Sequence, residues 1–308
     1  KTRICYFPVK KNYNVNNLDF LFIVKNGQKY FTHFFPLIKN NLVKNISNLQ
    51  FYIYENNSSD NTKKILQKFN TAKLFNIKME NIITTDNENS IYSSVEKYLN
   101  FKKYKRYSNI LEARNKLLTF YKKNICTNLA NLKNNWLILM DIDIIYDYNT
   151  IINLFRAIDK YPNGIMFCAN TSYVYKTKNI EEKYYDILAL EYGKFFNSNS
   201  NHKLDEMNLF FKNNIELQTG FGGLAIIRKD ILLNNYWEYG IPKECKKYDC
   251  FNEGYICEHW KFCENIRKYG KIYLVKDAKA LWIEDKLYEK KHFIKLSKLF
   301  MDHLGLFR

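Results

Sequence analysis

No apolar run in the 308-residue chain approaches the roughly 18 residues that a helix needs to cross a bilayer, and no signal-peptide pattern opens it. The chain begins at Lys1 without a methionine, so a fragment whose anchor or targeting segment was removed is compatible with it. It has four prolines, no Pro-rich linker and no internal repeat, which favours a single domain over residues 1–308. A hydrophobic content of 46% with 17% aromatics excludes a disordered chain.

Arginine is scarce, because only seven of the 48 basic residues are arginines although the net charge is +17. A guanidinium makes forked contacts to bases and phosphates, so its scarcity argues against a nucleic-acid reader. The lysines are spread along the whole chain beside frequent Asn, Tyr, Phe and Ile, as an AT-rich coding sequence produces. Three interpretations of the charge stay open: compositional drift, attraction to an anionic donor or glycan, and nucleic-acid binding.

Cysteine occurs an odd number of times, seven, so complete pairing within the chain is impossible. Three cysteines are isolated and look like small buried hydrophobes: Cys5, Cys126 and Cys168. The other four are spaced more widely than the ligand pairs of ordinary zinc sites: Cys245, Cys250, Cys257 and Cys263. Free thiols are the default expectation, and one or two disulfides in an oxidising compartment are the alternative.

Apolar strand patterns and helical patterns alternate along the chain, which predicts a largely parallel sheet with helical crossovers in the first 170 residues. Strands are expected at residues 21–24, 51–54, 82–83, 136–140, 164–169, 224–227, 272–275 and 278–283. Helices are expected at residues 31–43, 109–123, 150–161, 257–269 and 287–304, and in a segment that Asp60 caps and that ends near residue 69. Residues 171–214 have no clear period and are expected to form an insertion or substrate-facing region.

Residues 136–144 read Trp-Leu-Ile-Leu-Met-Asp-Ile-Asp-Ile, so an apolar run leads directly into Asp141 and Asp143. A short apolar run of this kind is typical of a buried parallel strand. Open sheets bind ligands at the carboxyl ends of such strands, and carboxylates suit Mg²⁺ or Mn²⁺, which in turn suit a diphosphate. The motif predicts a nucleotide-sugar site; an ordinary strand that ends in polar loop residues is the competing interpretation.

Four further segments accompany this motif. A polar turn, Glu-Asn-Asn-Ser-Ser-Asp-Asn-Thr at 55–62, and Ala-Arg-Asn at 113–115 precede it. Thr-Gly-Phe-Gly-Gly at 219–223 and Glu-His at 258–259, in the first turn of a predicted helix, follow it. The glycines permit positive φ angles and a close approach of ligand to backbone, although their spacing is not that of a phosphate loop.

In this order the segments resemble glycosyltransferases of the GT-A fold, over roughly residues 20–283. The 55–62 turn is similar to the family's first nucleotide-binding loop, with Glu55 in place of the usual leading Asp. Arg114 lies on a segment that resembles the helix facing the donor diphosphate; a surface arginine on an amphipathic helix is the alternative. Residues 54–62 and 257–259 look most like capsule-associated mannosyltransferase-like enzymes and glycosyltransferases of giant viruses.

The resemblance implies an α/β fold of the GT-A (Rossmann-like) type, with a mixed, mainly parallel central sheet flanked by helices in a single large domain. About residues 15–170 would form the nucleotide-sugar-binding half, and about residues 171–308 the acceptor-side half with a C-terminal helix. The residues implied in donor binding are Glu55, Asn57, Asp60, Arg114, Asp141 and Asp143, and those implied in acceptor binding are Gly222 and Gly223.

The resemblance also implies a Mn²⁺ or Mg²⁺ ion, with Asp143 as direct ligand and Asp141 binding through water or holding the ribose. Many members add a His from the final strand. Trp282 holds that place here, so His292 is the candidate, although a lone His is more often a surface or core residue. The candidate general base is Glu258, or else His259. A capping or helix-dipole role is the alternative for both, and a retaining enzyme would need no base.

The predicted function is that of a metal-dependent hexosyltransferase, which moves a sugar from a UDP- or GDP-sugar to a hydroxyl of a glycan or protein acceptor. The alternatives are a non-catalytic glycan- or nucleic-acid-binding module and, less favoured, a nucleotidyltransferase, for which residues 25–27 are a poor glycine-rich loop. The expected partners are the donor and a glycan or glycoprotein, without specific nucleic acid, and a homo-oligomer is compatible. The expected location is the cytoplasm, of the host or its viral factory if the chain is viral, or a secretory lumen if a targeting segment was removed.

Overall fold

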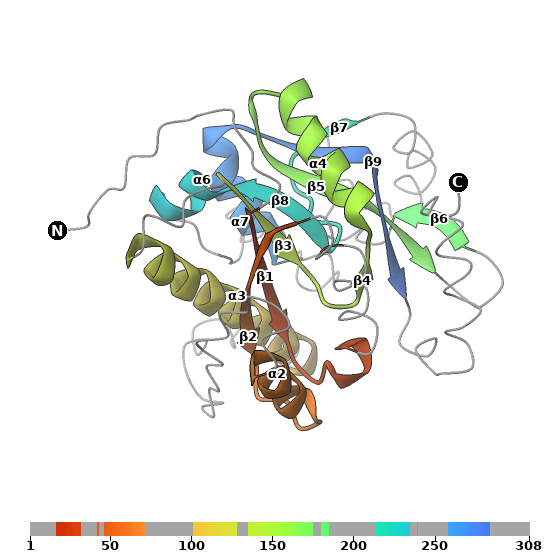
Figure 1. Ribbon diagram of the computed structural model, residues 1–308. Helices are drawn as coiled ribbons and strands as arrows, with labels where there is room; N and C mark the ends of the chain where they lie inside the picture. Colours follow the sequence, from red (N-terminus) through yellow and green to blue (C-terminus); the bar gives the residue numbers. More distant parts are fainter. Residues whose placement is uncertain are drawn as a thin grey trace.

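The computed structural model describes residues 17–31, 42, 46–71, 101–127, 135–174, 180–184, 214–234, 239 and 258–283. Within these residues one nine-stranded sheet forms the centre of the molecule, with helices packed against it (Figure 1). The order of the strands is β2-β1-β3-β8-β5-β9-β4, with β6 beside β5 and β7 beside β9. The fold class expected from the sequence, a mixed α/β sheet flanked by helices, is confirmed.

The strands are β1 (Asn17–Val24), β2 (Asn48–Glu55), β3 (Trp136–Met140), β4 (Ile144–Ile145), β5 (Gly164–Val174), β6 (Ile180–Tyr184), β7 (Ile215–Leu217), β8 (Leu224–Arg228) and β9 (Lys271–Ile283). The helices are α2 (Thr62–Thr71), α3 (Phe101–Thr127), α4 (Tyr148–Lys160), α6 (Lys229–Asn234) and α7 (His259–Ile266), which a 3₁₀ turn, η5 (Arg267–Tyr269), continues.

The core of the sheet is mainly parallel. Strands β1, β2 and β3 are parallel, and β5 and β9 point the same way because β8 runs antiparallel between β3 and β5. Strand β1 lies between β2 and β3, so the order of the strands reverses at β1. Open α/β sheets bind ligands outside the carboxyl ends of their strands at such a reversal, which is where β3 delivers Asp141.

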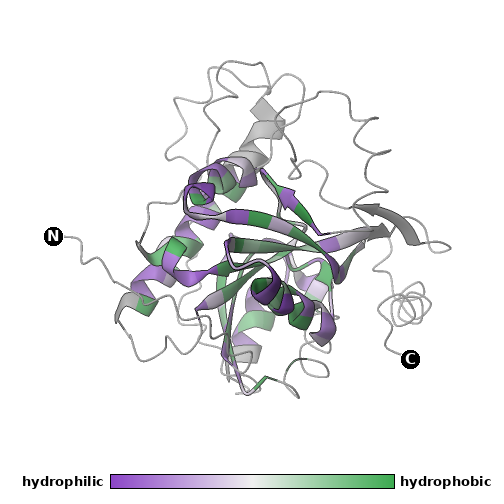
Figure 2. Ribbon diagram, turned by 90° about the horizontal axis from the view of Figure 1, so that it is seen from above, coloured by the Kyte–Doolittle hydropathy of each residue, from purple (hydrophilic) through white to green (hydrophobic). Residues whose placement is uncertain are grey.

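The sheet separates two apolar cores. Along β3, Leu137 and Leu139 face the core that α3, α6 and α7 cover, whereas Ile138 and Met140 face the core that α2 and α4 cover. Because both faces are covered, every residue of β3 is buried, which explains its uninterrupted apolar sequence. Hydrophobic and hydrophilic residues alternate around the covering helices (Figure 2).

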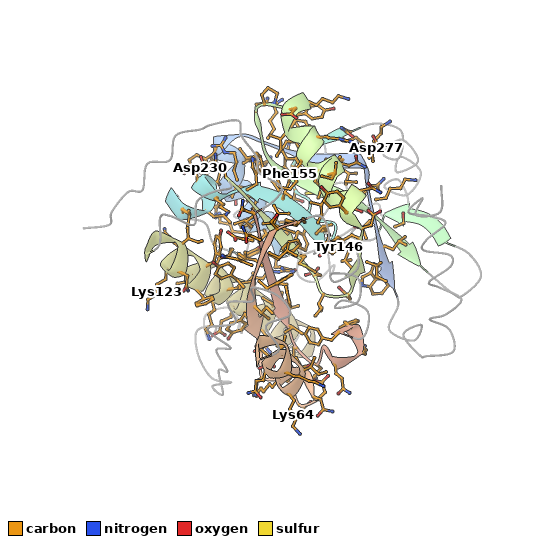
Figure 3. The ribbon with its side chains drawn as sticks, viewed as in Figure 1. Lys64, Lys123, Tyr146, Phe155, Asp230 and Asp277 are labelled. Atoms are coloured by element: carbon orange, nitrogen blue, oxygen red, sulfur yellow. The ribbon has the colours of Figure 1, made fainter. Side chains whose placement is uncertain are left out.

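Labelled side chains in Figure 3 show the same division between interior and surface. Phe155 on α4 and Tyr146 just before it lie in the interior, with exposed fractions of 1% and 0%. The charged side chains Lys64, Lys123 and Asp277 point outward (Figure 3). Many aromatic side chains of the described residues therefore pack between the sheet and its helices.

Most predicted elements that fall on described residues are present, with longer bounds. The strand expected at 164–169 continues to Val174, and the helix expected at 109–123 begins at Phe101. The two strands expected at 272–275 and 278–283 are wrong as separate elements, because a bulge joins them into β9: Ala169 pairs with Val275 and Asn170 with Lys279. The strand expected at 82–83, the helix at 287–304 and most of residues 31–43 and 171–214 lie outside the described residues.

Both predicted halves of the chain contribute to the same sheet, since β8 of the second half lies between β3 and β5 of the first. Cys168 and Cys263 are buried and form no disulfide, as the default expectation has it for these two cysteines. Among the described residues, no helix is both long enough and apolar enough to cross a membrane.

Candidate active site

Asp141 and Asp143 occupy the turn between β3 and β4. The backbone N–H of Asp141 donates to the carbonyl of Gly223 at 2.7 Å, which extends the pairing of β3 with β8 by one residue. Gly222 and Gly223 have φ angles of 65° and 70°, a left-handed conformation in which side chains are strained. The glycine turn therefore lies directly beside the Asp-x-Asp turn, at the edge of the sheet where β1, β2 and β3 end.

Arg114 on α3 connects Asp141 with Glu258. Its Nη2 donates to Asp141 Oδ1 at 2.9 Å and lies 3.2 Å from Glu258 Oε1, and its Nε donates to the same Glu258 oxygen at 3.2 Å. The side chain of Arg114 is 8% exposed, whereas those of Asp141 and Glu258 are 24% and 15% exposed. Burial acts to lower the pKa of Arg114, but the two carboxylate charges outweigh burial and raise it.

Two aromatic rings hold the guanidinium group in place. The Cζ atom of Arg114 lies 5.1 Å from the ring centroid of Phe221 and 5.7 Å from that of Tyr239. Asn115, the next residue on α3, fixes Tyr239 through its backbone: the Asn115 amide donates to the Tyr239 carbonyl at 3.0 Å and accepts from its N–H at 2.8 Å. The Ala-Arg-Asn motif thus places a charged group with Arg114 and anchors one wall of its pocket with Asn115.

Glu258 precedes α7 and makes no side-chain capping hydrogen bond to it. Its carboxylate is directed to Arg114 instead, within the same cluster as Asp141. Burial raises the pKa of Asp141, and the neighbouring charge of Glu258 raises it further, while Arg114 opposes both. For Glu258, the capping alternative considered from the sequence is therefore not what the side chain does.

His259 lies in the core. It is 1% exposed, and its ring stacks on Phe221 with a centroid distance of 4.1 Å and meets the Tyr239 ring edge-on at 5.4 Å. Burial, reinforced by the charge of Arg114 and opposed by that of Glu258, lowers the pKa of His259 to about 3. A neutral imidazole is therefore expected at neutral pH, packed behind Glu258 rather than facing solvent.

Trp282 contacts Asp143 directly. Strand β9 pairs antiparallel with β4, with Ile144 opposite Trp282, and this pairing brings Trp282 Nε1 to 2.8 Å from Asp143 Oδ2. An indole N–H is a donor only, so Trp282 binds the carboxylate but offers no lone pair to a cation. The position expected to carry a metal-binding His therefore does lie beside Asp143. His292, the candidate substitute, lies outside the described residues.

The turn at residues 55–62 is joined to the loop that follows β1. Ser58 Oγ accepts from the N–H of Asn26 and Thr62 Oγ1 from that of Gly27, both at 2.8 Å. Asp60 accepts the N–H of Gln28 at 3.1 Å and the N–H and hydroxyl of Thr62. Burial works against it, yet these hydrogen bonds lower the pKa of Asp60. The carboxylate of Asp60 accepts the N–H of Thr62, the first residue of α2, and also fixes the neighbouring loop.

Glu55 and Asn57 differ in their surroundings. Glu55, the last residue of β2, is fully buried; its Oε1 accepts the N–H of Ser58 at 2.6 Å, whereas its Oε2 has no hydrogen-bond partner. The Nζ atom of Lys63 lies 3.9 Å from that oxygen. Asn57 is exposed, has a φ angle of 50° and accepts from Lys63 at 3.3 Å. A buried acceptor atom and an exposed amide therefore lie next to each other at this edge.

The described residues contain no group of three or more His, Cys, Asp or Glu side chains that could hold a metal ion. Mg²⁺ in phosphate-transfer sites is commonly held by one or two carboxylates together with substrate phosphates and water. Asp143, with Asp141 beside it, fits that smaller set. Arg114 already contacts Oδ1 of Asp141, which favours Asp143 as the direct ligand.

Several residues of this cluster were not identified from the sequence: Phe221, Tyr239 and the bridging role of Asn115. Phe221 lies within the quoted glycine cluster, so its position was visible but not its packing on Arg114 and His259. Tyr239 closely follows Tyr236 and Trp237 but belongs to no recognised motif, so no sequence signal distinguishes it from them. Thr171, also missed, donates its hydroxyl to the carbonyl of Gly222 and so supports the glycine turn.

Comparison with known proteins gives likenesses of fold only. No family model matches the chain, and no curated protein matches its sequence. A crystal structure of S. aureus TarS residues 1–349 matches with 13% identity and a TM-score of 0.49, over 92% of this chain and 64% of that one. GalNAc-T7 with UDP, GalNAc and Mn²⁺ matches with 12% identity and a TM-score of 0.49, over 89% of this chain and 45% of that one.

The TarS 1–349 structure in complex with UDP-GlcNAc matches with 13% identity and a TM-score of 0.47, over 87% of this chain and 58% of that one. This chain thus spans less than two thirds of each solved chain. At TM-scores below 0.5 these likenesses assign neither a family nor an activity.

Proposed function

We propose that the protein is a metal-dependent glycosyltransferase of the GT-A class, which uses a nucleoside-diphosphate sugar as donor. The observation that carries this proposal is the cluster at the carboxyl end of β3. There Asp141 and Asp143 follow a buried strand at the point where the strand order reverses. Arg114 contacts both Asp141 and Glu258, so Glu258 belongs to the same cluster. Clustered carboxylates of this kind can hold the cation that a diphosphate donor needs, and one of them can accept a proton.

The donor is proposed to lie across the ends of β1, β2 and β3. Glu55 and Asn57 offer an acceptor and an amide to the base or ribose, and Asp60 keeps the loop beside them in shape. The buried Oε2 of Glu55 supports this assignment, because it accepts no hydrogen bond and Lys63 Nζ lies 3.9 Å away, so a donor from a ligand would stabilise it. UDP- and GDP-sugars are both compatible with this arrangement.

A Mn²⁺ or Mg²⁺ ion is proposed to be held by Asp143, with Asp141 as an indirect ligand and His292 as a further candidate. Such an ion neutralises charge on the leaving nucleoside diphosphate. Trp282 keeps the carboxylate of Asp143 in one orientation through its hydrogen bond. Asp141 remains tied to the glycine turn through its backbone and to Arg114 through its side chain.

Glu258 is proposed as the general base of an inverting transfer. Its carboxylate would accept the proton of an acceptor hydroxyl, whose oxygen attacks the anomeric carbon as the nucleoside diphosphate leaves. Two observations support Glu258 over His259: it makes no capping bond, and it is 15% exposed, whereas His259 is buried. The backbone of Gly222 and Gly223, beside Asp141, is proposed to approach the acceptor.

Two finer assignments rest on the sequence. The likeness to capsule-associated mannosyltransferase-like and giant-virus enzymes concerns only residues 54–62 and 257–259. A glycan or glycoprotein is the proposed acceptor, and the cytoplasm, of a host or its viral factory, is the proposed location.

A thermal-shift screen of UDP- and GDP-sugars, each with and without Mn²⁺, tests the proposed function. We expect at least one donor to raise the melting temperature, and to raise it more with the metal. Stabilisation by a nucleoside triphosphate alone would indicate a nucleotidyltransferase instead. Stabilisation by glycans without any response to donors would indicate a non-catalytic binding module.

A further inference from the structure

The guanidinium group of Arg114 already contacts two carboxylates, unlike that of an arginine whose donors are left for a phosphate. One nitrogen, Nη2, contacts both carboxylates, at 2.9 Å from Asp141 and 3.2 Å from Glu258, and Nε makes a second contact with Glu258. The ligands of the guanidinium group are therefore already in place, and both are residues of the proposed site. An arginine that also bound a diphosphate in this geometry would bring two further negative charges close to two carboxylates.

The pocket of Arg114 is built to keep the side chain where it is. Phe221 and Tyr239 pack on the guanidinium group, both are buried, and Asn115 fixes the backbone of Tyr239 with two hydrogen bonds. Phe221 directly precedes the Gly222–Gly223 turn, whose carbonyl holds the backbone of Asp141. The wall that holds Arg114 therefore belongs to the same turn that holds Asp141.

The charges of Asp141, Glu258 and Arg114 also favour an arginine that stays between the two carboxylates. Asp141 and Glu258 repel each other, and their repulsion adds to the effect of burial in raising the pKa of Asp141. Arg114 is the cation that both carboxylates contact, and a guanidinium group does not release its proton in proteins. Replacing it with a group that cannot reach both carboxylates would remove the contacts that Nε and Nη2 make with Glu258.

Resting on the proposed function, we propose that Arg114 is a positioning residue: it fixes the orientation of Glu258, and it stays with Glu258 and Asp141 when the donor binds. It is not a ligand of the donor diphosphate, the role that its place in the sequence implies. The proton of the acceptor is then taken by a carboxylate that Arg114 has oriented.

The variant Arg114→Lys tests this role, because lysine keeps the positive charge but cannot make the forked contact. We expect the affinity for the donor with Mn²⁺, measured by calorimetry, to stay unchanged, and kcat to fall by about 10²-fold because Glu258 is displaced. Arg228→Lys is the matched control: Arg228 forms a forked pair with Asp230 on α6, and this variant should keep the kcat and the donor affinity of the wild type.

A double-mutant cycle with Glu258→Gln separates the two roles of Arg114. If Arg114 acts through Glu258, adding Arg114→Lys to Glu258→Gln lowers kcat no further. If Arg114 binds the diphosphate, the losses multiply and Arg114→Lys weakens donor binding by roughly 10-fold or more, which would overturn the inference.

Tyr239→Leu provides a second variant if Arg114→Lys does not fold, because it opens one wall of the pocket and keeps the arginine. We expect kcat to fall with donor affinity unchanged, and weaker donor binding would overturn the inference here as well. A wild-type protein that binds no donor would instead defeat the proposed function itself, so the two failures are distinguishable.

Discussion

His259 gives the most quantitative prediction about the site, because burial, reinforced by the charge of Arg114, keeps its imidazole neutral. Its imidazole is 1% exposed and its pKa is lowered to about 3, whereas an unfolded chain holds histidine at a pKa near 6.5. Between these two values the unfolded state binds a proton that the folded state does not. The free energy of unfolding must therefore fall as the pH falls through this window, by up to about 1.4 kcal/mol per pH unit.

From about pH 7 to about pH 5, this single group is expected to lower the free energy of unfolding by about 2 kcal/mol. Urea denaturation at both pH values, for the wild type and for His259→Gln, measures the contribution as the difference between their pH dependences. The variant should lose less stability on acidification, because glutamine does not titrate. Equal pH dependences, or an NMR titration of the His259 ring with a pKa near 6.5, would refute the burial argument and restore His259 as a candidate base.

Two further predictions concern the side chains that contact Asp19 and the one that contacts Asp143. Lys229→Met leaves the buried carboxylate of Asp19 without the ammonium group that lies 2.6 Å away, so we expect a loss of about 3–5 kcal/mol in urea denaturation. Tyr121→Phe removes only a hydrogen bond of 2.6 Å to the same carboxylate and should cost about 1.5–3 kcal/mol; equal costs would refute this ranking. Trp282→His exchanges a donor beside Asp143 for a group that can ligate a cation, and should strengthen Mn²⁺ binding in calorimetry; unchanged or weaker binding would refute the placement of the ion.

The parts of this site that depend on local sequence could be predicted. The residues of β3 before Asp141 are all apolar because both faces of that strand are covered, so its burial can be recognised from the sequence. Asp60 could be placed at the start of a helix because a carboxylate there binds a backbone N–H only two or three residues away. The hydrogen bond that Asp60 accepts from the N–H of Gln28, 32 residues away, could not be recognised from the residues near Asp60.

The parts that depend on packing between distant segments could not be predicted. Arg114 donates a hydrogen bond to Glu258, which is 144 residues away in the sequence, and nothing in either segment indicates that the two side chains are in contact. The sequence places His259 in the first turn of a helix, but only the packing of Phe221 and Tyr239 around it determines its burial and its pKa. The bulge that makes β9 one strand likewise depends on its pairing with β5.

The central claim, that Asp143 anchors a cation and a nucleoside diphosphate, is tested most directly by calorimetry of donor binding to Asp143→Asn. Asparagine keeps an oxygen that can accept from Trp282 Nε1, so the variant removes charge with little change of shape. Asp159→Asn, an exposed carboxylate on α4, is the matched control. We predict that Mn²⁺ tightens donor binding to the wild type and the control by about tenfold or more, and does not tighten binding to Asp143→Asn. Equal tightening in all three proteins would contradict the account.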